Sequence, residues 1–460
     1  MLEVTVHSDV DFGRGEAGGE IHQRRRGVLS CRSCRHCLFC ASPAAGRHAG
    51  SRVRRRGRGA YPPPSDANHS LLRLTPAVDI DTQPPALGAP TGAELTSWPL
   101  NDKLTEIDLD LEDRDRVSVL PWRGQFSPLT VERLLSALAP CDAVVLDPFV
   151  GSGTALIESA RRGHSSIGLD INPAAVAFAQ CAALASYSPE QRIRHIAAAM
   201  NTAFDSTNLV LQESRIDVAH ALVLLAHTGR SPAAARRRLT EVMMSLPAAP
   251  VPTQARLGDA RATGIEDGSI GFIVTSPPYI NVFNYHEYGR PITDSFGWPV
   301  LTAARSEIGS NRQNRQNRFR TVVQYSIDMA LVLLEMSRVL TEGSTAVLVL
   351  GRESRVRGVP FLNGEILACL ASGLDLFDRR TRATRSFVNR FGKDIYEDVL
   401  VLEASKHTTL DKADALRVGR SVGVEALRDC QYTPETAVEI AAAIEGSPRI
   451  VASAIKDGAR

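Results

Sequence analysis

The side chains best suited to chemistry in this sequence lie in residues 275–279, which read TSPPY and follow the apolar run 270–274. Because proline cannot continue the hydrogen-bond ladder of a central strand, this pattern predicts a buried strand that ends in a rigid, extended turn. The ring of Tyr279 is able to stack on a planar group whose amine hydrogens are accepted by the Ser276 hydroxyl and the Pro277 carbonyl. Taken alone, a proline-rich strand end without a chemical role explains these residues equally well.

A glycine-rich turn, DPFVGSGT at 147–154, is the second motif; it follows the apolar run 143–146 and precedes a helical pattern at 155–162. Glycines at a strand-to-helix turn let a ligand approach the backbone closely, and the helix N-terminus offers free N–H groups. The next predicted strand, 166–169, ends at Asp170, about twenty residues beyond the glycines, where a carboxylate accepts hydrogen bonds from both hydroxyls of a ribose. The sequence contains no Gly-Lys-Ser/Thr phosphate loop, and the aspartate and proline that open the turn are unusual for a dinucleotide fold. The turn therefore favours an adenosine ligand without phosphates.

These motifs need a large α/β core to position them, and the composition supports one. The chain has 460 residues, of which 43% are hydrophobic, enough for one α/β domain with an insertion and tails. Its apolar runs fall short of the ~20 residues of a membrane span, and its first residues have no secretory pattern. We therefore expect a cytoplasmic protein without membrane contacts. The net charge of +2 indicates nothing about nucleic acid by itself.

Residues 1–97 are predicted to form a disordered leader and linker. The stretch 21–60 contains eleven arginines and no acidic residue, a composition that cannot form a packed core. Within it, four cysteines have a CxxCxxCxxC spacing that suits an iron–sulfur cluster or zinc: Cys31, Cys34, Cys37 and Cys40. Their flanks are of low complexity, and no proline directly follows the last of them. We therefore favour a disordered leader, or one translated from DNA upstream of the true start codon, and expect no bound metal.

Four motifs follow one another along the chain: DPFVGSGT at 147–154, GLDINP at 168–173, LGDAR at 257–261 and TSPPY at 275–279. In this order they resemble the amino-methylating branch of the DNA methyltransferases that use S-adenosylmethionine, over residues 124–404. The resemblance implies a class I methyltransferase fold, which is a Rossmann-like α/β fold with a seven-stranded, mostly parallel, doubly wound sheet. It also implies S-adenosylmethionine as the cofactor, double-stranded DNA as the partner and a target base flipped into the pocket. A cognate restriction endonuclease is a further partner that it implies.

The resemblance also assigns roles to residues by their place in the motifs. Cofactor binding is expected at Phe126, Asp147, Phe149, Gly151, Gly153, Thr154, Asp170 and Asp259. The catalytic turn is expected to hold the target base through Ser276, Pro277, Pro278 and Tyr279. Members with an aspartate before the two prolines usually methylate adenine N6, whereas those with serine usually methylate cytosine N4, so Ser276 predicts a cytosine-N4 enzyme. The alternatives are methylation of adenine N6 or of an exocyclic amine in RNA, and a non-catalytic nucleic-acid-binding protein on the same fold.

Residues suited to DNA follow the catalytic turn. The stretch 305–320 reads RSEIGSNRQNRQNRFR, and its arginines, asparagines and glutamines suit phosphates and purine edges. We expect a mobile loop there that contacts DNA through Arg312, Arg315 and Arg318, with Asn281 nearer the target base. A solvated surface loop is the alternative. A second basic stretch, 379–393, is also a candidate for binding phosphate.

The rest of the chain divides around the motifs. Residues 98–186 and 253–404 are predicted to be the two halves of the methyltransferase core, with a helical insertion at 187–252 between them. The insertion exceeds the single helix that the core needs, which makes it a candidate for target recognition or for a lid. Residues 405–460 are predicted to be a helical tail without identifiable chemistry. These patterns do not predict the target sequence.

Overall fold

The structure is a computed structural model that describes most of the chain after residue 93. The described residues are 94–110, 120, 122, 124–205, 216–227, 231–280, 284–298, 300–310, 314–388, 392–405 and 410–456. The chain divides into two units, 1–79 and 80–460, and every described residue belongs to the second unit. The predicted leader therefore lies outside the described residues, apart from 94–97, and so do the four cysteines of the CxxCxxCxxC run.

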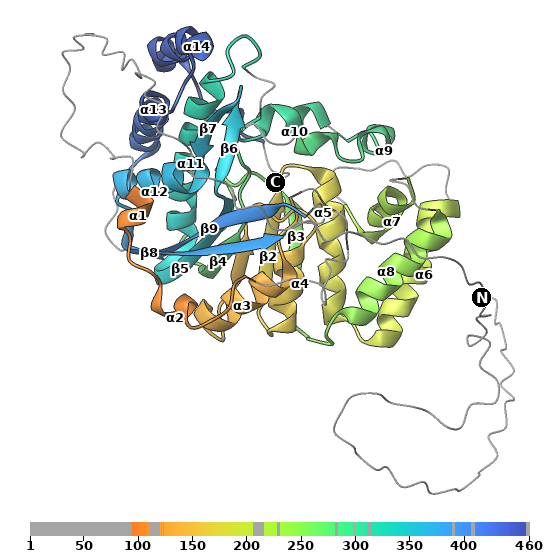
Figure 1. Ribbon diagram of the computed structural model, residues 1–460. Coiled ribbons are helices and arrows are strands. Elements are labelled where there is room, and N and C mark those ends of the chain that lie inside the picture. The colour runs from red at the N-terminus through yellow and green to blue at the C-terminus, as the bar shows by residue number, and fades with distance from the viewer. Residues whose placement is uncertain are drawn as a thin grey trace, which may run out of the picture. The chain divides into compact units, whose positions relative to one another are not determined.

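The core of this unit is a seven-stranded sheet with the order β3-β2-β1-β4-β5-β9-β8 (Figure 1). Its strands are β1 (Val145–Asp147), β2 (Ser166–Asp170), β3 (Thr253–Leu257), β4 (Ile270–Thr275), β5 (Leu340–Gly351), β8 (Phe377–Val388) and β9 (Asp394–Ala404). The first five are parallel, whereas β9 pairs antiparallel with both β5 and β8. The chain begins the sheet at β1, moves outward to β3 and then returns to β4, so the strand order reverses between β1 and β4. This confirms the predicted doubly wound, mostly parallel sheet.

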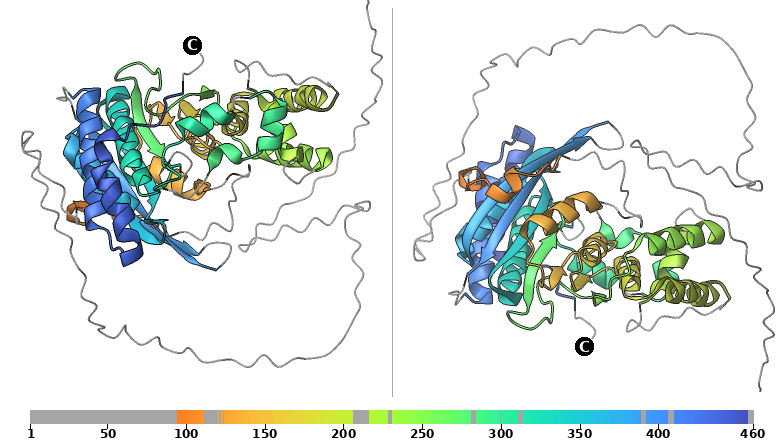
Figure 2. Two further views of the ribbon diagram at one scale, coloured as in Figure 1. Left: turned by 90° about the horizontal axis from the view of Figure 1, so that it is seen from above. Right: turned by 90° about the horizontal axis from the view of Figure 1, so that it is seen from below.

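Alternating apolar side chains bury both faces of the sheet, because successive residues of a strand point to opposite sides. Val145 and Phe272 join the cluster formed with α3 (Pro128–Leu138), whereas Leu146 and Ile273 join the cluster on the other face. The first face also carries α4 (Thr154–Arg161), and the second carries α11 (Arg320–Val339) and α12 (Asn363–Leu374). Figure 2 shows the two groups of helices on opposite sides of the strands.

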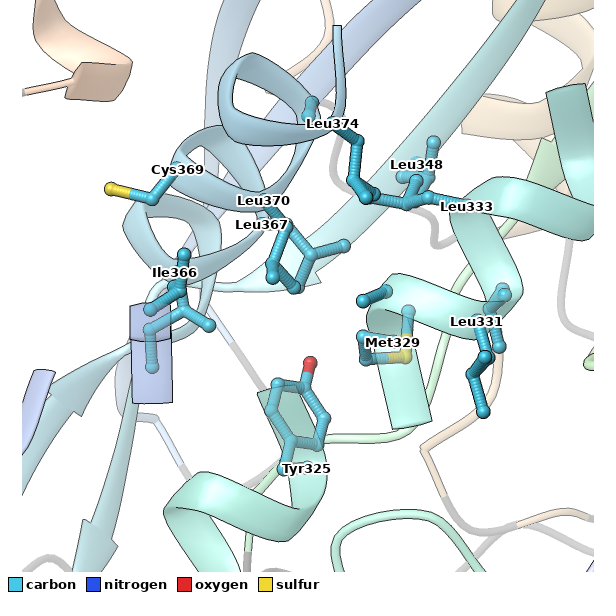
Figure 3. Close-up of a cluster of buried hydrophobic side chains, with 14 of the residues drawn as sticks. Tyr325, Met329, Leu331, Leu333, Leu348, Ile366, Leu367, Cys369, Leu370 and Leu374 are labelled. Carbon is cyan, nitrogen blue, oxygen red and sulfur yellow. The ribbon is translucent and has the colours of Figure 1, made fainter. Parts of the chain in front are cut away.

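The largest apolar cluster lies between β5, α11 and α12 (Figure 3). Its fully buried side chains include Leu348 of β5, Met329 and Leu333 of α11, and Leu367, Leu370 and Leu374 of α12. Helix α13 (Lys412–Asp429) packs on the outer side of α11 and adds Val418 and Val422 to this cluster. Because α11 is covered on both sides, nearly all of its residues are buried, which explains its apolar sequence.

Several shorter elements surround this core. They are α1 (Glu94–Ser97), α2 (Asp102–Thr105), α5 (Pro173–Ala179), η1 (Gln180–Ser186), α6 (Pro189–Asp205), α7 (Val218–His227), α8 (Pro232–Ser245), η2 (Tyr285–Glu287), α9 (Arg290–Ser295), α10 (Val300–Ser306), the β6 (Glu353–Val356) and β7 (Val359–Leu362) hairpin, α14 (Pro434–Glu445) and η3 (Ser447–Arg449). Helices α6, α7 and α8 fill the predicted insertion and lie beyond the β3 edge of the sheet (Figure 1). The buried Arg192 of α6 donates to the carbonyls of Met243 and Leu246 at 2.9 and 2.8 Å, which ties α6 to the end of α8.

Local signals explain where some elements begin, but one strand has only a weak local signal. Ser127 caps α3: its hydroxyl accepts the N–H of Thr130, and proline follows it at the first helical position. In contrast, most of the basic stretch 379–393 forms β8 at the edge of the sheet. Its inward positions include the small residues Thr381 and Ala383, and its outward positions include Arg380 and Arg382, which are half-buried at the edge of the sheet. This mixture obscures the usual alternation of apolar and polar residues.

Candidate active site

A pocket opens where β1, β2, β3 and β4 end, at the point where the strand order reverses. In open α/β sheets this is the place where ligands bind. The pocket has an empty volume of about 920 Å³. It is lined by Phe126, Asp147, Phe149, Gly151, Thr154, Asp170 and Asp259 of the predicted cofactor site, and by Ser276, Pro277, Pro278 and Tyr279 of the predicted catalytic turn. The two motifs therefore share one cavity, and Gly153 lies just outside its lining.

Two glycines of the turn after β1 have left-handed backbone conformations that other residues rarely adopt. Gly151 has a φ of +51°, and Gly153 has a φ of +87°. A Cβ at Gly153 would lie 2.7 Å from the Cα of Ala179 in α5, and a Cβ at Gly151 would lie 3.1 Å from the indole of Trp122. Gly153 therefore lets α4 and α5 approach each other behind the pocket, whereas Gly151 forms part of its wall.

Two carboxylates stand at the ends of β1 and β2 and line the pocket. Asp170 accepts hydrogen bonds from the backbone N–H groups of Asn172 at 2.8 Å and Gly151 at 3.2 Å. Asp147 accepts one hydrogen bond from the Thr275 hydroxyl at 2.6 Å and another from the backbone N–H of Phe149 at 3.1 Å. Burial raises the pKa of Asp170 to about 6 and the pKa of Asp147 to about 7, and the hydrogen bonds oppose only part of this shift. Such a pocket favours a cationic ligand that also donates hydroxyl hydrogens.

The predicted catalytic turn follows β4 directly and has no regular secondary structure from 276 to 279. The Ser276 Oγ and the Tyr279 Oη lie 3.5 Å apart. The ring of Tyr279 lies against Gly351 at the end of β5, where a Cβ would be 3.1 Å from the ring Cε2. Burial, followed by the nearby charge of Glu397, raises the pKa of Tyr279 to about 12. The turn therefore presents a neutral aromatic ring in a fixed position beside a hydroxyl.

Asp259 lines the pocket, but its carboxylate is already engaged by other groups. Oδ1 accepts hydrogen bonds from the Arg261 Nε at 2.9 Å and from the Arg261 backbone N–H at 3.0 Å. Oδ2 accepts hydrogen bonds from the Arg261 Nη2 at 2.7 Å and from the Lys456 backbone N–H at 3.0 Å. Because four N–H donors occupy this carboxylate, its main effect is to hold the loop after β3 in place.

The pocket also contains residues that the sequence patterns did not identify: Trp122, Gln125, Ile171, Tyr285, Glu307 and Ile308. Trp122 and Gln125 are close neighbours of Phe126 in the sequence, so their proximity to a predicted pocket residue was an available signal. The Gln125 side chain donates to the Ser152 Oγ at 2.9 Å, which joins the segment before α3 to the glycine-rich turn.

Glu307 lies in the stretch 305–320, which was expected to be a mobile or solvated loop. That expectation is wrong for residues 306–310, which are buried. The Glu307 carboxylate lies 2.8 Å from the Nδ1 of His286, whose side chain is fully buried. This contact joins the segment after the catalytic turn to the pocket wall. No local pattern predicts it, because the two residues are 21 positions apart in the sequence.

The predicted DNA-binding residues are only partly described. Asn281 and Arg312 lie outside the described residues. Arg315 is exposed and Arg318 is half-buried, and neither lines the pocket. Nearby, the buried Asn317 donates to the carbonyl of Glu439 in α14 at 2.6 Å, which anchors this stretch. DNA binding by Arg315 and Arg318 stays a prediction.

Two further properties concern only the described part of the chain. Within it, no group of three or more His, Cys, Asp or Glu side chains is placed to hold a metal ion. None of its helices is both long enough and apolar enough to cross a membrane. The CxxCxxCxxC cysteines lie outside it, so neither observation concerns them.

Comparison with known families matches the first part of this site. Residues 106–180, which include the glycine-rich turn and Asp170, match the DNA methylase family of N6 and N4 type. The Type II methyltransferase M.ScaI of Streptomyces caespitosus is 43% identical over 48 residues, and M.MjaII of Methanocaldococcus jannaschii is 42% identical over 53 residues. These matches cover 10% and 12% of this chain, and only 16% and 10% of the two relatives.

Solved structures of methyltransferases also align with this chain. A SAM-dependent methyltransferase of Methanosarcina mazei covers 60% of this chain and 98% of its own length, at 15% identity and a TM-score of 0.33. An rRNA methyltransferase of Streptomyces viridochromogenes covers 70% and 99%, at 14% identity and a TM-score of 0.29. Because both TM-scores are low, the fold assignment depends on the strand order of the sheet itself.

Proposed function

We propose that this chain is an S-adenosylmethionine-dependent DNA methyltransferase that methylates the exocyclic N4 amine of a flipped cytosine. The observation that carries the proposal is a single pocket lined by the glycine-rich turn and Asp170 on one side and by Ser276 and Tyr279 on the other. The family match over residues 106–180 supports DNA methylation. The serine at position 276, in place of aspartate, supports cytosine rather than adenine as the target base.

The residues of the pocket fit S-adenosylmethionine, which carries positive charge and two ribose hydroxyls. The pocket offers the buried carboxylates of Asp147 and Asp170, whose pKa values burial raises. Asp170 is assigned to the ribose hydroxyls, and Asp147 to the positive end of the cofactor. Phe126, Phe149, Gly151 and Thr154 complete the wall, Gly153 supports it from behind, and Asp259 acts through the loop that it holds.

The catalytic turn prepares the target amine for reaction. An exocyclic amine is a poor nucleophile, because its lone pair is delocalised into the base. When the Ser276 hydroxyl and the Pro277 carbonyl accept its two hydrogens, a pyramidal nitrogen with a localised lone pair is favoured. S-Adenosylmethionine, when bound, supplies an activated methyl group to this pocket. Tyr279 holds the plane of the base, Pro278 keeps the turn rigid, and the methylated amine is acidic enough to lose its proton without a strong base.

DNA contacts outside the pocket are assigned by charge and exposure. Arg315 is proposed to bind phosphate, and Arg318 to assist it, because both lie in the basic stretch after the catalytic turn. Helices α6 to α8 are proposed to take part in target recognition, since Arg236 and Arg237 are exposed on α8. A cognate restriction endonuclease is retained as a proposed partner, because both curated relatives are named type II methyltransferases.

The chemical identity of the methylated nucleoside tests this proposal. The full chain is incubated with methyl-labelled S-adenosylmethionine and mixed-sequence duplex DNA, with RNA in parallel, and the products are digested to nucleosides and identified by mass. We expect N4-methylcytosine from DNA. N6-Methyladenine would correct the target base, and a labelled RNA nucleoside would correct the substrate. If no nucleoside is labelled and the cofactor does not bind, the non-catalytic alternative replaces the proposal.

Cofactor affinity is expected to increase with pH from about pH 5 to about pH 7 and to change little above that. In the unliganded protein the pKa of Asp170 is about 6 and that of Asp147 is about 7. A cationic ligand favours their ionised forms, so at lower pH its binding must release protons. Calorimetry in buffers of different ionisation enthalpy measures both affinity and proton release. S-Adenosylhomocysteine lacks the sulfonium charge, so its affinity should depend less on pH. An affinity for S-adenosylmethionine that is constant with pH would contradict the assignment.

Asp147 and Asp170 make the folded protein less stable as pH rises, whereas most acidic residues make it more stable. Their folded-state pKa values lie above the ordinary aspartate value of 3.8, so the folded protein binds more protons than the unfolded chain between about pH 4 and about pH 7. Stability therefore falls as pH rises through this window. Asp147→Asn resembles the neutral carboxyl and should gain about 2–3 kcal/mol of unfolding free energy relative to the wild type between about pH 5 and about pH 8.

A further inference from the structure

The segment 450–456 contacts residues of the pocket although it is far from them in the sequence. It has no regular secondary structure, and its polar groups bond to a cluster of buried charges beside the pocket. Arg261, on the loop after β3, is the centre of this cluster. Its Nη2 lies 2.7 Å from Asp259 and its Nη1 lies 2.6 Å from Asp328, and all three side chains are almost completely buried.

The segment supplies the hydrogen bonds that this cluster needs. Arg261 donates to the carbonyls of Ser453 and Ala454, each at 2.9 Å. In return, the backbone N–H and the hydroxyl of Ser453 donate to the two oxygens of Asp328 at 2.9 and 2.7 Å. Buried charges are tolerated only when they are paired and fully hydrogen-bonded. The cluster beside the pocket therefore depends on residues 450–456 being in place.

Lys456 connects this segment to the exits of two strands. Its backbone N–H donates to the Asp259 carboxylate after β3 at 3.0 Å, and its Nζ donates to the carbonyl of Ile171 after β2 at 3.2 Å. Both Asp259 and Ile171 line the pocket, and Ile171 directly follows Asp170. The Lys456 side chain is buried, and its positive charge lowers the pKa of Asp170 in part, against the larger effect of burial.

The loop after β3 is held by bonds to other elements, among them those of Thr263 to Glu335 and of Asp267 to Arg338 in α11. Residues 258–269 connect β3 to β4, and none of them belongs to a helix. In most crossover connections a helix packs on the sheet and sets where the strand exits lie. In the β3–β4 connection, bonds to α11 and to residues 450–456 perform that task, and Arg261 makes bonds to both.

We propose that Lys456 and Arg261 are positioning residues of the cofactor site. They hold Ile171 and Asp259 at the spacing that the adenosine half of the ligand requires, an inference that rests on the proposed function. Binding of the ligand and ordering of residues 450–456 are then coupled, and by reciprocity each favours the other.

Lys456→Met tests the proposal, because it removes the ammonium group and keeps most of the aliphatic length. The affinity of the full chain for S-adenosylhomocysteine, measured by calorimetry, is expected to fall about tenfold, within the usual range of coupling between sites. The KM for S-adenosylmethionine should rise by a similar factor, while kcat at saturating cofactor stays the same. A merely structural role would instead lower the melting temperature and leave KM unchanged.

Arg420→Met is the matched control, because Arg420 lies in α13 and contacts the start of the same segment. Arg420 donates to the carbonyls of Ser447 at 3.0 Å and Ile450 at 2.7 Å, at the end of the segment away from the pocket. This variant should lower the melting temperature and leave the affinity for S-adenosylhomocysteine within about twofold of the wild type. If it loses affinity as strongly as Lys456→Met, general loosening of the segment explains the effect and the positioning role is wrong.

Hydrogen exchange gives the reciprocal measurement on the wild type. The amides of Ser453 and Lys456 donate to buried carboxylates, so S-adenosylhomocysteine should slow their exchange several-fold if binding and ordering are coupled. Unchanged exchange at 453–456, together with slower exchange at 147–154, would overturn the coupling. A wild type that binds neither S-adenosylhomocysteine nor S-adenosylmethionine would overturn the proposed function instead.

Discussion

Replacing Tyr279 with alanine is expected to lower kcat for methyl transfer about 100-fold, because the ring that stacks on the target base is lost and base–aromatic stacking contributes about 1–3 kcal/mol. The ring lies against the backbone of Gly351, where a Cβ would be 3.1 Å from the ring Cε2. Tyr279 is the only aromatic residue in the turn 276–279. Its loss therefore removes the orientation of the target amine as well as its stacking partner. Steady-state methylation of duplex DNA at saturating cofactor measures the effect.

Tyr279→Phe is the control that separates the ring from the hydroxyl. The Tyr279 Oη lies 3.5 Å from the Ser276 Oγ, which is long for a hydrogen bond between hydroxyls, so its loss should change kcat by less than about fivefold. Both variants should bind S-adenosylhomocysteine within about threefold of the wild type, because the change concerns the target-base side of the pocket. Equal losses of kcat in the two variants would show that the hydroxyl carries the function and that stacking does not.

Gly153→Ala is expected to lower the unfolding free energy by about 2–4 kcal/mol, the sum of left-handed backbone strain and overpacking. The backbone of Gly153 has a φ of +87°, and the added Cβ would lie 2.7 Å from the Cα of Ala179. Since this atom belongs to the backbone of α5, no side-chain rotation relieves the contact. The glycine-rich turn must shift, and cofactor affinity should fall at least about tenfold. Urea denaturation and calorimetry with S-adenosylhomocysteine measure the two effects.

Gly163→Ala provides the comparison, because its backbone is similar and its surroundings are open. Gly163 has a φ of +80°, and a Cβ there would meet nothing within 4 Å. This variant should lose only about 1–2 kcal/mol from backbone strain and bind the cofactor normally. If both variants lose the same stability, the approach of α5 has no measurable cost and backbone strain alone accounts for the need for glycine at position 153.

The sequence by itself determined the two strand exits that carry the site, since their signals are local. An apolar run followed by glycines or by two prolines is readable within ten residues, and β4 indeed ends at Thr275, directly before the catalytic turn. Asp170 ends β2 as predicted. Once the strands are parallel and adjacent, their carboxyl ends meet at one edge, so the predicted residues Asp147, Asp170 and Tyr279 line the same pocket.

Only the tertiary structure decided how this pocket is supported and closed. Arg261 bonds to Asp328, 67 residues away, and to Ser453, 192 residues away. Glu307, expected in a mobile loop or, as the alternative, a solvated one, is a buried part of the pocket wall and contacts His286. A charged residue becomes buried only when a distant segment supplies its partner, and such a pairing leaves no periodic pattern near either residue. For this reason the sequence predicted the residues of the turns, whereas the groups that hold those turns in place were found only in the folded chain.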